Sequence, residues 1–235
     1  MGTEAPTGER VAATLREDIT EGRLAPGTPL RDAVLATELG VSRHTLRAAL
    51  RLLEHDGLVE YQMHKGVVVR ALSPADVNEI YRVRRVLEIS AVDQSALAPQ
   101  DGLDELDRCV AAAHAAVAGR EWGRVGTASL RFHQALVALL GSASIDRFFA
   151  STLAQLRLAF ATMHDEARWQ TPWIPRDREI CDLLLRGERQ HAAALLRQYL
   201  DESETAVLDV VRAHTADRRS RRRRTSQQPS QPKEV

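Results

Sequence analysis

Near the N-terminus, apolar residues recur at every fourth position. Val11, Leu15 and Ile19 form this stripe, which predicts an amphipathic helix that ends at Gly22. The next segment, LAPGTPL at 24–30, contains two prolines and a glycine, the composition of a turn. The chain is therefore expected to open with one helix and a change of direction.

Two short helices are expected next, over about 32–39 and over 42–56. Gly40 ends the first, and the Ser42 hydroxyl is suited to cap the second by accepting from an amide of its first turn. One side of the 42–56 helix is apolar, with Leu46, Ala49 and Leu53. The other side is cationic and polar, with Arg43, His44, Arg47 and Arg51. Such a helix suits the major groove of DNA, although a surface helix with solvated arginines has the same pattern.

A β-hairpin is expected after Gly57, which is suited to end the third helix. Leu58, Val59 and Tyr61 predict one strand and Val67–Val69 a second, joined by 62–66. The tip of this hairpin holds His64, Lys65 and Gly66. A glycine there lets the backbone approach a sugar-phosphate chain, and the lysine supplies a positive charge. Three helices and a hairpin form a winged helix-turn-helix, expected over residues 1–72.

From Ser73 and Pro74 to about Ala213 the pattern is helical, without a convincing strand. Ser73 is suited to be an N-cap and Pro74 the first residue of a helix. Helices are expected at 74–97, 102–119, 121–140, 144–167, 174–186 and 188–213. Ala, Leu, Arg and Glu dominate, as in helical bundles. The predicted fold class is therefore mainly α: an N-terminal winged helix-turn-helix joined to a C-terminal all-α helical bundle over 73–215.

Composition restricts the kind of protein without changing this architecture. The 235 residues are 44% hydrophobic, 27% charged and 4% aromatic, which is typical of a helix-rich globular protein. No apolar run approaches the ~18 to 20 residues of a membrane span, and the first residues contain no apolar signal-peptide core. Cys109 and Cys181 stand far apart without a CxxC motif, which fits a reducing cytoplasm and excludes a thiolate zinc site. We therefore expect a cytoplasmic protein with no membrane contact.

The charge is unevenly distributed along the chain. Of the 32 basic and 32 acidic residues, seven and one lie in 218–235, which leaves 25 bases and 31 acids in the rest. An acidic protein still binds nucleic acid if the contacting face is cationic, because phosphates are contacted one residue at a time. The segment 216–235 is rich in Arg, Gln, Ser and Pro and is expected to be a disordered tail. It adds phosphate affinity or serves only as a solubilising extension.

One stretch of the N-terminal domain is specific enough to indicate a family. Between about Arg10 and Arg70 it contains LREDITEGRLAPGTPL and LATELGVSRHTLRAALRLLEHDGLVEYQMHKGVVV. This stretch resembles the DNA-binding domain of the GntR family of bacterial transcription regulators. The resemblance implies DNA contacts from the third helix and from the hairpin, made by Ser42, Arg43, His44, Thr45, Arg47, His64, Lys65 and Gly66.

The second helix departs from the family pattern. The family usually has an arginine in L-x-E-R-x-L-A, whereas this chain has LRDAVLA, with Ala33 at that position. Arg31, two residues earlier, is the candidate to replace the missing contact. We expect an altered operator preference or weaker binding rather than loss of DNA binding.

The C-terminal half resembles the FadR-like (FCD) subfamily of the same family. The matching segments are VRRVLEISAV (83–92), FHQALVALLGSASI (132–145) and DREICDLLLRGERQHAAALLRQYL (177–200). With the N-terminal domain, the resemblance covers roughly residues 10–212. It implies a helical domain that binds an effector and forms a dimer.

Many members of the subfamily hold a divalent metal at the bundle centre through an Asp and three His. The corresponding positions here are Ser129, His133, Asp177 and Tyr199, of which only His133 keeps the family's ligand type. Asp177 still offers a carboxylate oxygen, so that a degenerate site would consist of His133 and Asp177. A typical zinc site has three or four protein ligands. We therefore expect no cofactor, and the ligand set for a divalent metal is incomplete.

The same positions are candidates to line an effector pocket. Ser129 and His133 share a helix face with Leu136, and Arg84 is the candidate partner of an effector carboxylate. The effector-binding set is therefore Arg84, Ser129, His133, Asp177 and Tyr199. The alternatives are an intrahelical pair of Arg84 with Glu88 and a core histidine at position 133. Trp169 and Trp173 either cap the cavity or pack in the core.

The patterns and the resemblance together imply a DNA-binding transcription regulator. The resemblance further implies a repressor that is controlled by a small organic-acid or acyl metabolite bound in the C-terminal domain. One recognition helix spans few base pairs, so a homodimer on a pseudo-palindromic double-stranded operator is expected. The alternative is a regulator whose C-terminal domain only dimerises and binds no ligand or metal. No Ser-His-Asp context, phosphate loop or complete metal set indicates an enzyme, so no catalytic residue is expected. The effector, the operator and the sign of regulation stay open.

Overall fold

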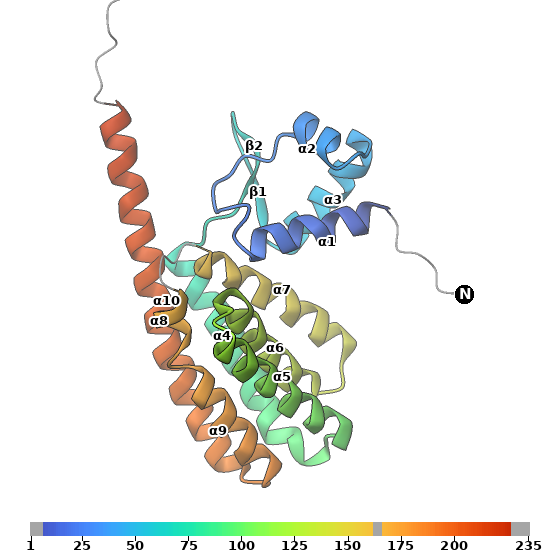
Figure 1. The fold of residues 1–235 in the computed structure, drawn as a ribbon, viewed down its shortest axis with the longest axis vertical. Helices are drawn as coiled ribbons and strands as arrows, with labels where there is room; N and C mark the ends of the chain where they lie inside the picture. The colour runs from blue at the N-terminus through green and yellow to red at the C-terminus, as the bar shows by residue number, and fades with distance from the viewer. Residues whose placement is uncertain (1–6, 162–165, 227–235) are drawn as a thin grey trace, which may run out of the picture.

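The computed structural model describes residues 7–161 and 166–226, which form a small N-terminal part packed on one end of a helical bundle (Figure 1). The N-terminal part consists of α1 (Thr7–Thr20), α2 (Asp32–Glu38), α3 (Arg43–His55), β1 (Val59–Gln62) and β2 (Gly66–Val69). The two strands pair antiparallel, with Val59 opposite Val69 and Gln62 opposite Gly66. This confirms the predicted winged helix-turn-helix.

The core of the N-terminal part lies between α1 and α3. Leu15, Ile19, Leu46 and Leu53 are buried there, as their apolar stripes predict. Each such side chain contributes roughly 1.5–3 kcal/mol when it leaves water. The packing leaves the polar side of α3 exposed to solvent.

The proline-rich turn at 24–30 also pairs with the hairpin. The Gly27 amide donates to the Val69 carbonyl and the Leu30 amide to the Val67 carbonyl, both at 2.8 Å. Pro29 forms an isolated bridge with Val68. The turn therefore follows the free edge of β2, and this places Arg31 beside the wing.

The bundle consists of helices joined by short connections. They are α4 (Pro74–Gln94), the short 3-10 helix η1 (Ser95–Leu97), α5 (Gln100–Ala118), α6 (Trp122–Ala138), α7 (Ala143–Phe160), α8 (Glu166–Gln170), α9 (Ile174–Leu185) and α10 (Arg189–Ser226). Ser73 caps α4 in a capping box with Asp76, and Pro74 occupies its first turn. Among the described residues, no helix combines the length and the apolar character needed to cross a membrane.

The helix expected over 144–167 is wrong at its C-terminal end. α7 ends at Phe160, and α8 is a separate short helix that begins at Glu166. The rings of Phe160 and Trp169 lie 4.6 Å apart. In one straight helix, nine residues rise about 13 Å, so this ring contact requires the chain to fold back.

The expected disordered tail over 216–235 is wrong as far as residue 226. α10 runs from Arg189 to Ser226 and extends beyond the bundle (Figure 1). The segment 189–226 contains no glycine or proline, and arginine is a good helix former. Residues 227–235 lie outside the described part of the chain.

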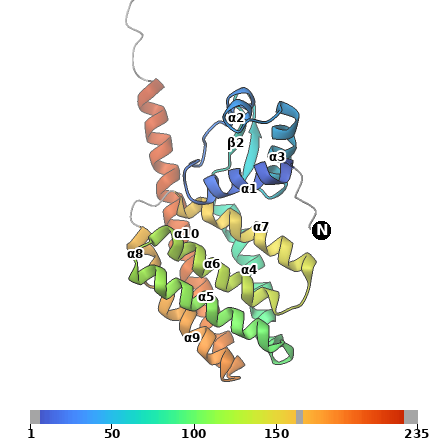
Figure 2. The same ribbon diagram turned by 45° about the vertical axis from the view of Figure 1, so that its right-hand side comes forward.

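The N-terminal part rests on α7 (Figure 2). Ser151 donates to the Asp56 carboxylate at 3.1 Å, and Gln155 donates to the Asp56 carbonyl at 3.0 Å. Arg157 donates through Nε to the Thr20 carbonyl at 3.1 Å. Since Asp56 is the C-cap of α3, α7 is joined directly to the end of that helix.

Candidate nucleic-acid interface and buried polar centre

The first turn of α3 is exposed to solvent. Arg43 and His44 stand at its start, and Ser42 caps it by accepting from the Thr45 amide at 3.1 Å. The hydroxyls of Ser42 and Thr45 also share a hydrogen bond of 2.8 Å. The N-terminus of a helix attracts phosphate through its free amides and dipole. This end of α3 is therefore suited to an anionic partner.

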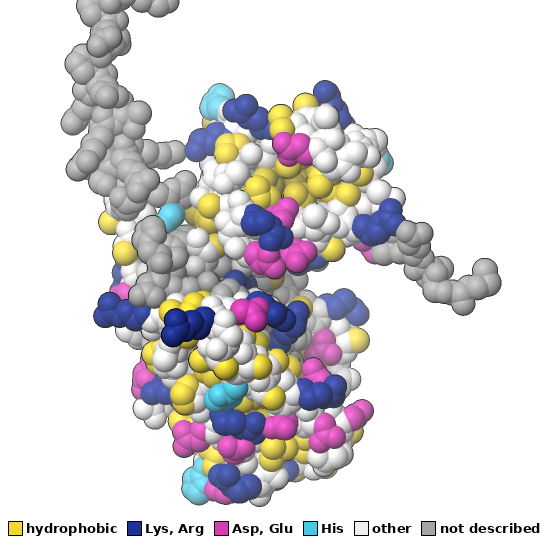
Figure 3. All heavy atoms as spheres, viewed as in Figure 1, with side chains coloured by type: hydrophobic (Ala, Val, Ile, Leu, Met, Phe, Trp, Pro, Cys, Tyr) yellow, Lys and Arg dark blue, Asp and Glu magenta, His cyan; other side chains and the backbone are white. Residues whose placement is uncertain are grey.

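A groove between α3 and the wing brings together several of the predicted DNA contacts. It has a volume of about 480 Å³, and Arg31, Arg47, Lys65 and Gly66 all line it. Figure 3 shows Lys and Arg side chains on the end of the N-terminal part that faces away from the bundle. The groove collects cationic groups from the N-cap of α2, from α3 and from the hairpin, which lie up to thirty-four positions apart in sequence.

Arg47 is held in place within this groove. Its Nε donates to the Asp32 carboxylate at 2.8 Å, while 65% of its side chain stays exposed. An exposed pair of this kind contributes little to stability. Its effect is to orient a guanidinium that still reaches solvent.

The remaining predicted contacts lie elsewhere on the N-terminal part. His44 and Thr45 line a separate hollow beside the start of α1, and His64 has a φ of 68°. Arg51 and Tyr61 also line the groove. The sequence places Arg51 on the cationic side of its helix and Tyr61 in the first strand, but neither was predicted as a DNA contact. Tyr61 is 71% exposed, although strand alternation puts it on the same face as the buried Val59. The pattern of the sequence therefore held no signal for its exposure. Ala33 is exposed on α2 without a charged group to offer.

The bundle centre contains a cluster of buried polar side chains. Members of the predicted effector set converge there from α4, α6, α9 and α10: Arg84, Ser129, His133, Asp177 and Tyr199. Each of them is at most 5% exposed. Glu88 belongs to the cluster and was named in the sequence only as the pairing alternative for Arg84.

Glu88 joins two of these side chains. Arg84 donates through Nε to Glu88 Oε1 at 2.7 Å, and His133 Nδ1 lies 2.7 Å from Glu88 Oε2. The intrahelical pair of Arg84 is therefore present, and His133 is a buried histidine with one bonded nitrogen. Burial raises the pKa of Glu88, but the charge of Arg84 and the bond with His133 bring it below its usual value.

The other half of the cluster is incompletely hydrogen-bonded. Ser129 donates to Asp177 Oδ2 at 2.7 Å, while His133 Nε2 and Asp177 Oδ1 lie 3.6 Å apart. Arg84 Nη2, His133 Nε2 and Asp177 Oδ1 have no hydrogen-bond partner. Burial raises the pKa of Asp177 to about 6. Unpaired buried atoms of this kind are satisfied by a proton shared between the groups, by water or by a ligand.

These residues do not fit a divalent metal. Of the predicted positions, only His133 Nε2 and Asp177 Oδ1 offer unoccupied metal-ligand atoms that face each other. The Ser129 hydroxyl is bonded to the same carboxylate, and the nearby charge of Arg84 opposes a cation. Within the described residues, no three His, Cys, Asp or Glu side chains form a group that could hold a metal ion. Three or four ligands are the norm for zinc.

The space beside this cluster is very small. The cavity near Arg84 and Tyr199 has a volume of only about 10 Å³. That is roughly the room of one water molecule. The rings of Trp173 and Tyr199 meet edge to face with their centroids 5.1 Å apart, and the Trp173 ring lies 6.0 Å from that of Trp169. The two tryptophans therefore pack in the core and also border this cavity.

We expect D177N to change how stability depends on pH. Because the folded-state pKa of Asp177 is about 6 against 3.8 for the ordinary group, the folded protein holds that proton over this range. The protonated Asp177 carboxyl therefore stabilises the folded protein at low pH, and this contribution is lost as the pH rises toward 6. The free energy of unfolding of D177N should exceed that of the wild type by up to about 3 kcal/mol at pH 7, and this difference should disappear near pH 4. Urea unfolding at several pH values measures this.

The exposed residue Asp209 on α10 provides the matched control, since D209N also removes one carboxylate. The expectation is wrong if D177N and the wild type show parallel stability curves from pH 4 to 7.

Both parts of the chain match known family models. Residues 7–69 match the model of bacterial regulatory proteins, gntR family, and residues 79–202 match the FCD domain. An uncharacterized HTH-type transcriptional regulator of Agrobacterium vitis is 33% identical over 144 residues, which is 58% of this chain and 84% of that protein. The gluconate operon transcriptional repressor of Bacillus licheniformis is 37% identical over 101 residues, 43% of this chain and 41% of that protein.

A solved structure supports the same assignment. The crystal structure of a protein described as a transcriptional regulator GntR from Rhodococcus sp. RHA1 superposes with a TM-score of 0.81 at 35% identity. The match covers 86% of this chain and 97% of that one. The likeness therefore extends over both parts of the fold.

Proposed function

The chain belongs to the GntR family of bacterial regulatory proteins and carries an FCD domain, and from this premise we propose that it is a sequence-specific repressor whose DNA affinity is controlled by a small organic-acid or acyl metabolite. Regulators of this family bind DNA. Relatives named as repressors, such as the gluconate operon repressor, support the sign of regulation. The proposal includes no catalytic activity and places the protein in the cytoplasm with its DNA.

The groove between α3 and the wing carries the proposal. It gathers Arg31, Arg47 and Lys65 on one exposed face. In the proposed complex α3 enters the major groove, and the wing follows the sugar-phosphate chain. Since one such helix covers few base pairs, two copies of the chain are proposed to bind a pseudo-palindromic operator as a homodimer.

Helix α7 provides the proposed link between the effector and the DNA. Leu156 and Phe160 on this helix border the cavity of the polar centre. Ser151 and Gln155 on the same helix are bonded to Asp56 at the end of α3. A ligand that enlarges the cavity would therefore displace α7, and with it the contacts that hold the end of α3. It shifts the equilibrium only if it binds the two arrangements unequally.

One observation favours a second candidate function. The polar centre has room for about one water molecule and is partly satisfied by its own ion pairs. A regulator whose C-terminal domain only dimerises, without ligand or metal, would have such a centre.

A gel shift with DNA from upstream of the protein's own gene tests the proposal. We expect a specific shifted band that competitor DNA of unrelated sequence does not remove. The band should weaken as the salt concentration rises. Protein binding releases cations from the DNA phosphates, and this release is less favourable at high salt. Absence of a specific band at low salt would contradict the proposal. Thermal unfolding with a panel of carboxylate metabolites separates the two candidates, because only a bound ligand stabilises the fold.

A further inference from the structure

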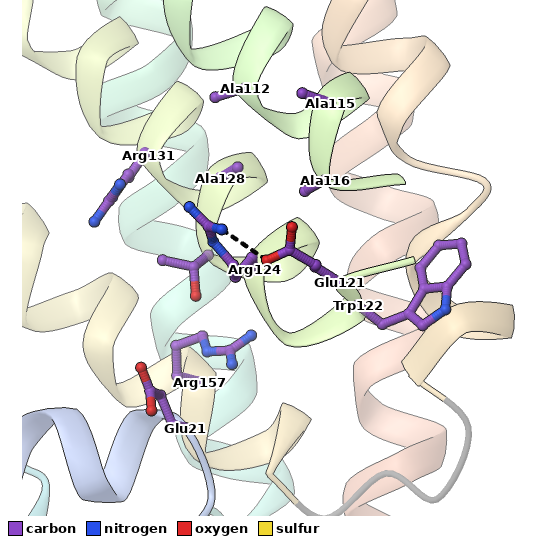
Figure 4. Close-up of a pocket in the computed structure, with 11 residues that line it drawn as sticks. Glu21, Ala112, Ala115, Ala116, Glu121, Trp122, Arg124, Ala128, Arg131 and Arg157 are labelled. Atoms are coloured by element: carbon purple, nitrogen blue, oxygen red, sulfur yellow. Dashed lines mark hydrogen bonds and ion pairs between the residues drawn. The ribbon is translucent and has the colours of Figure 1, made fainter. Parts of the chain in front are cut away.

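A large pocket lies between the two parts of the protein, away from the polar centre. Its volume is about 710 Å³, against about 10 Å³ at the centre. Figure 4 shows its walls: α5 and α6 on one side, α7 and Glu21 after the end of α1 on the other. Ligand sites commonly have volumes of roughly 300–1,000 Å³. The volume of this pocket is sufficient for a small molecule, whereas that of the centre is not.

One wall of the pocket is apolar because its side chains are short. Ala112, Ala115 and Ala116 line it from α5, and Ala128 lines it from α6. Trp122, the first residue of α6, also belongs to the lining, and its indole points away from the arginines (Figure 4). These methyl groups give a surface that suits a hydrocarbon chain or an aromatic ring.

The rest of the lining is polar and carries charges of both signs. Arg124, Arg131 and Arg157 line the pocket together with two acids, Glu21 and Glu121. Both acids already have partners within the described residues. Glu121 pairs with Arg124 at 2.6 Å, and Glu21 pairs with Arg23, which lies outside the pocket.

Two of the arginines differ in how they are held. Arg157 is 6% exposed, donates to the Thr20 carbonyl and lies over the Phe160 ring at 5.4 Å. Arg131 is exposed, and in the described part of the chain no carboxylate forms an ion pair with it. A guanidinium beside an apolar wall attracts a carboxylate that carries an apolar body.

We propose that this pocket binds a small amphipathic carboxylate, with the carboxylate at Arg131 and the apolar body against the alanine wall. The binding itself does not depend on the proposed function; only its regulatory consequence does. The pocket is bordered by Glu21 of the N-terminal part and by Arg157, which holds the Thr20 carbonyl. Its ligand therefore touches both parts and favours one placement of the N-terminal part over others.

Calorimetric titration of the full chain with octanoate tests this inference, with octanamide as an uncharged match. We expect octanoate to bind and octanamide to bind at least about tenfold more weakly, since a charge-assisted hydrogen bond contributes about 1.5–3 kcal/mol. R131Q should weaken octanoate by a similar factor. R108Q is its control, because Arg108 is an exposed arginine on α5 outside the pocket.

A second pair of variants tests the apolar wall without changing charge. A112F places a ring in the pocket and should abolish octanoate binding, whereas A111F places the same ring on the exposed side of α5. Both positions are exposed, so both variants are expected to fold. Circular dichroism checks this.

Two results would overturn the inference. One is the absence of octanoate binding by the wild type at millimolar concentration. The other is octanoate binding that survives A112F and R131Q but is lost in Y199F, which would move the site to the polar centre. Neither result affects the gel shift of the wild type without ligand, so failure of this inference and failure of the proposed function are separate observations.

Discussion

Replacing Glu88 with alanine is expected to lower the free energy of unfolding by about 3–5 kcal/mol. Glu88 is fully buried and accepts from Arg84 while it bonds His133. Its removal leaves a guanidinium, itself only 2% exposed, without its counter-charge. An unpaired buried charge costs far more than the pair contributes, because its hydration is not restored. Urea unfolding at pH 7, followed by circular dichroism, measures the loss.

The same helix supplies the control for this variant. Glu79 pairs with Arg82 at 3.3 Å, and both side chains are mostly exposed, at 68% and 74%. E79A is therefore expected to change stability by no more than about 0.5 kcal/mol. If E88A does not fold, E88Q, which keeps an acceptor for Arg84, should fold with a smaller loss. A loss for E88A as small as that for E79A would show that the buried network contributes nothing.

The double variant R43A/R47A should lose site-selective DNA binding. Each arginine that contacts a base contributes about 1–3 kcal/mol of discrimination, so selectivity should fall by at least about thirtyfold. Arg43 is exposed at the start of α3, and Arg47 lines the groove beside Lys65. Fluorescence anisotropy with operator and shuffled duplexes, at two salt concentrations, separates selectivity from phosphate attraction.

R82A is the matched control, because Arg82 is a mostly exposed arginine on α4, away from the N-terminal part. The variant protein must keep its circular dichroism spectrum and its state of association. Undiminished preference for the operator in R43A/R47A would show that another surface reads the DNA.

Local patterns were sufficient for most of the fold. Ser73 caps its helix through its own hydroxyl, and the apolar stripes that contain Leu15 on α1 and Leu46 on α3 each follow helical geometry. These interactions join residues close in sequence, so the pattern itself contains them. The expected helix over 144–167 failed because Trp169 folds back on Phe160. A contact between the side chains of two helices leaves no periodic signal in the sequence.

The sequence by itself determined the type and order of the elements, the family, and the residue types available at the DNA-facing helix and the bundle centre. Tertiary structure alone decided that Glu88 joins Arg84 to His133, that the centre has space for about one water, and that Arg131 borders a pocket between the two parts. The physical reason is range. Helix periodicity and capping act over a few residues, whereas a cavity is the space left between helices, and its volume depends on how all their side chains pack.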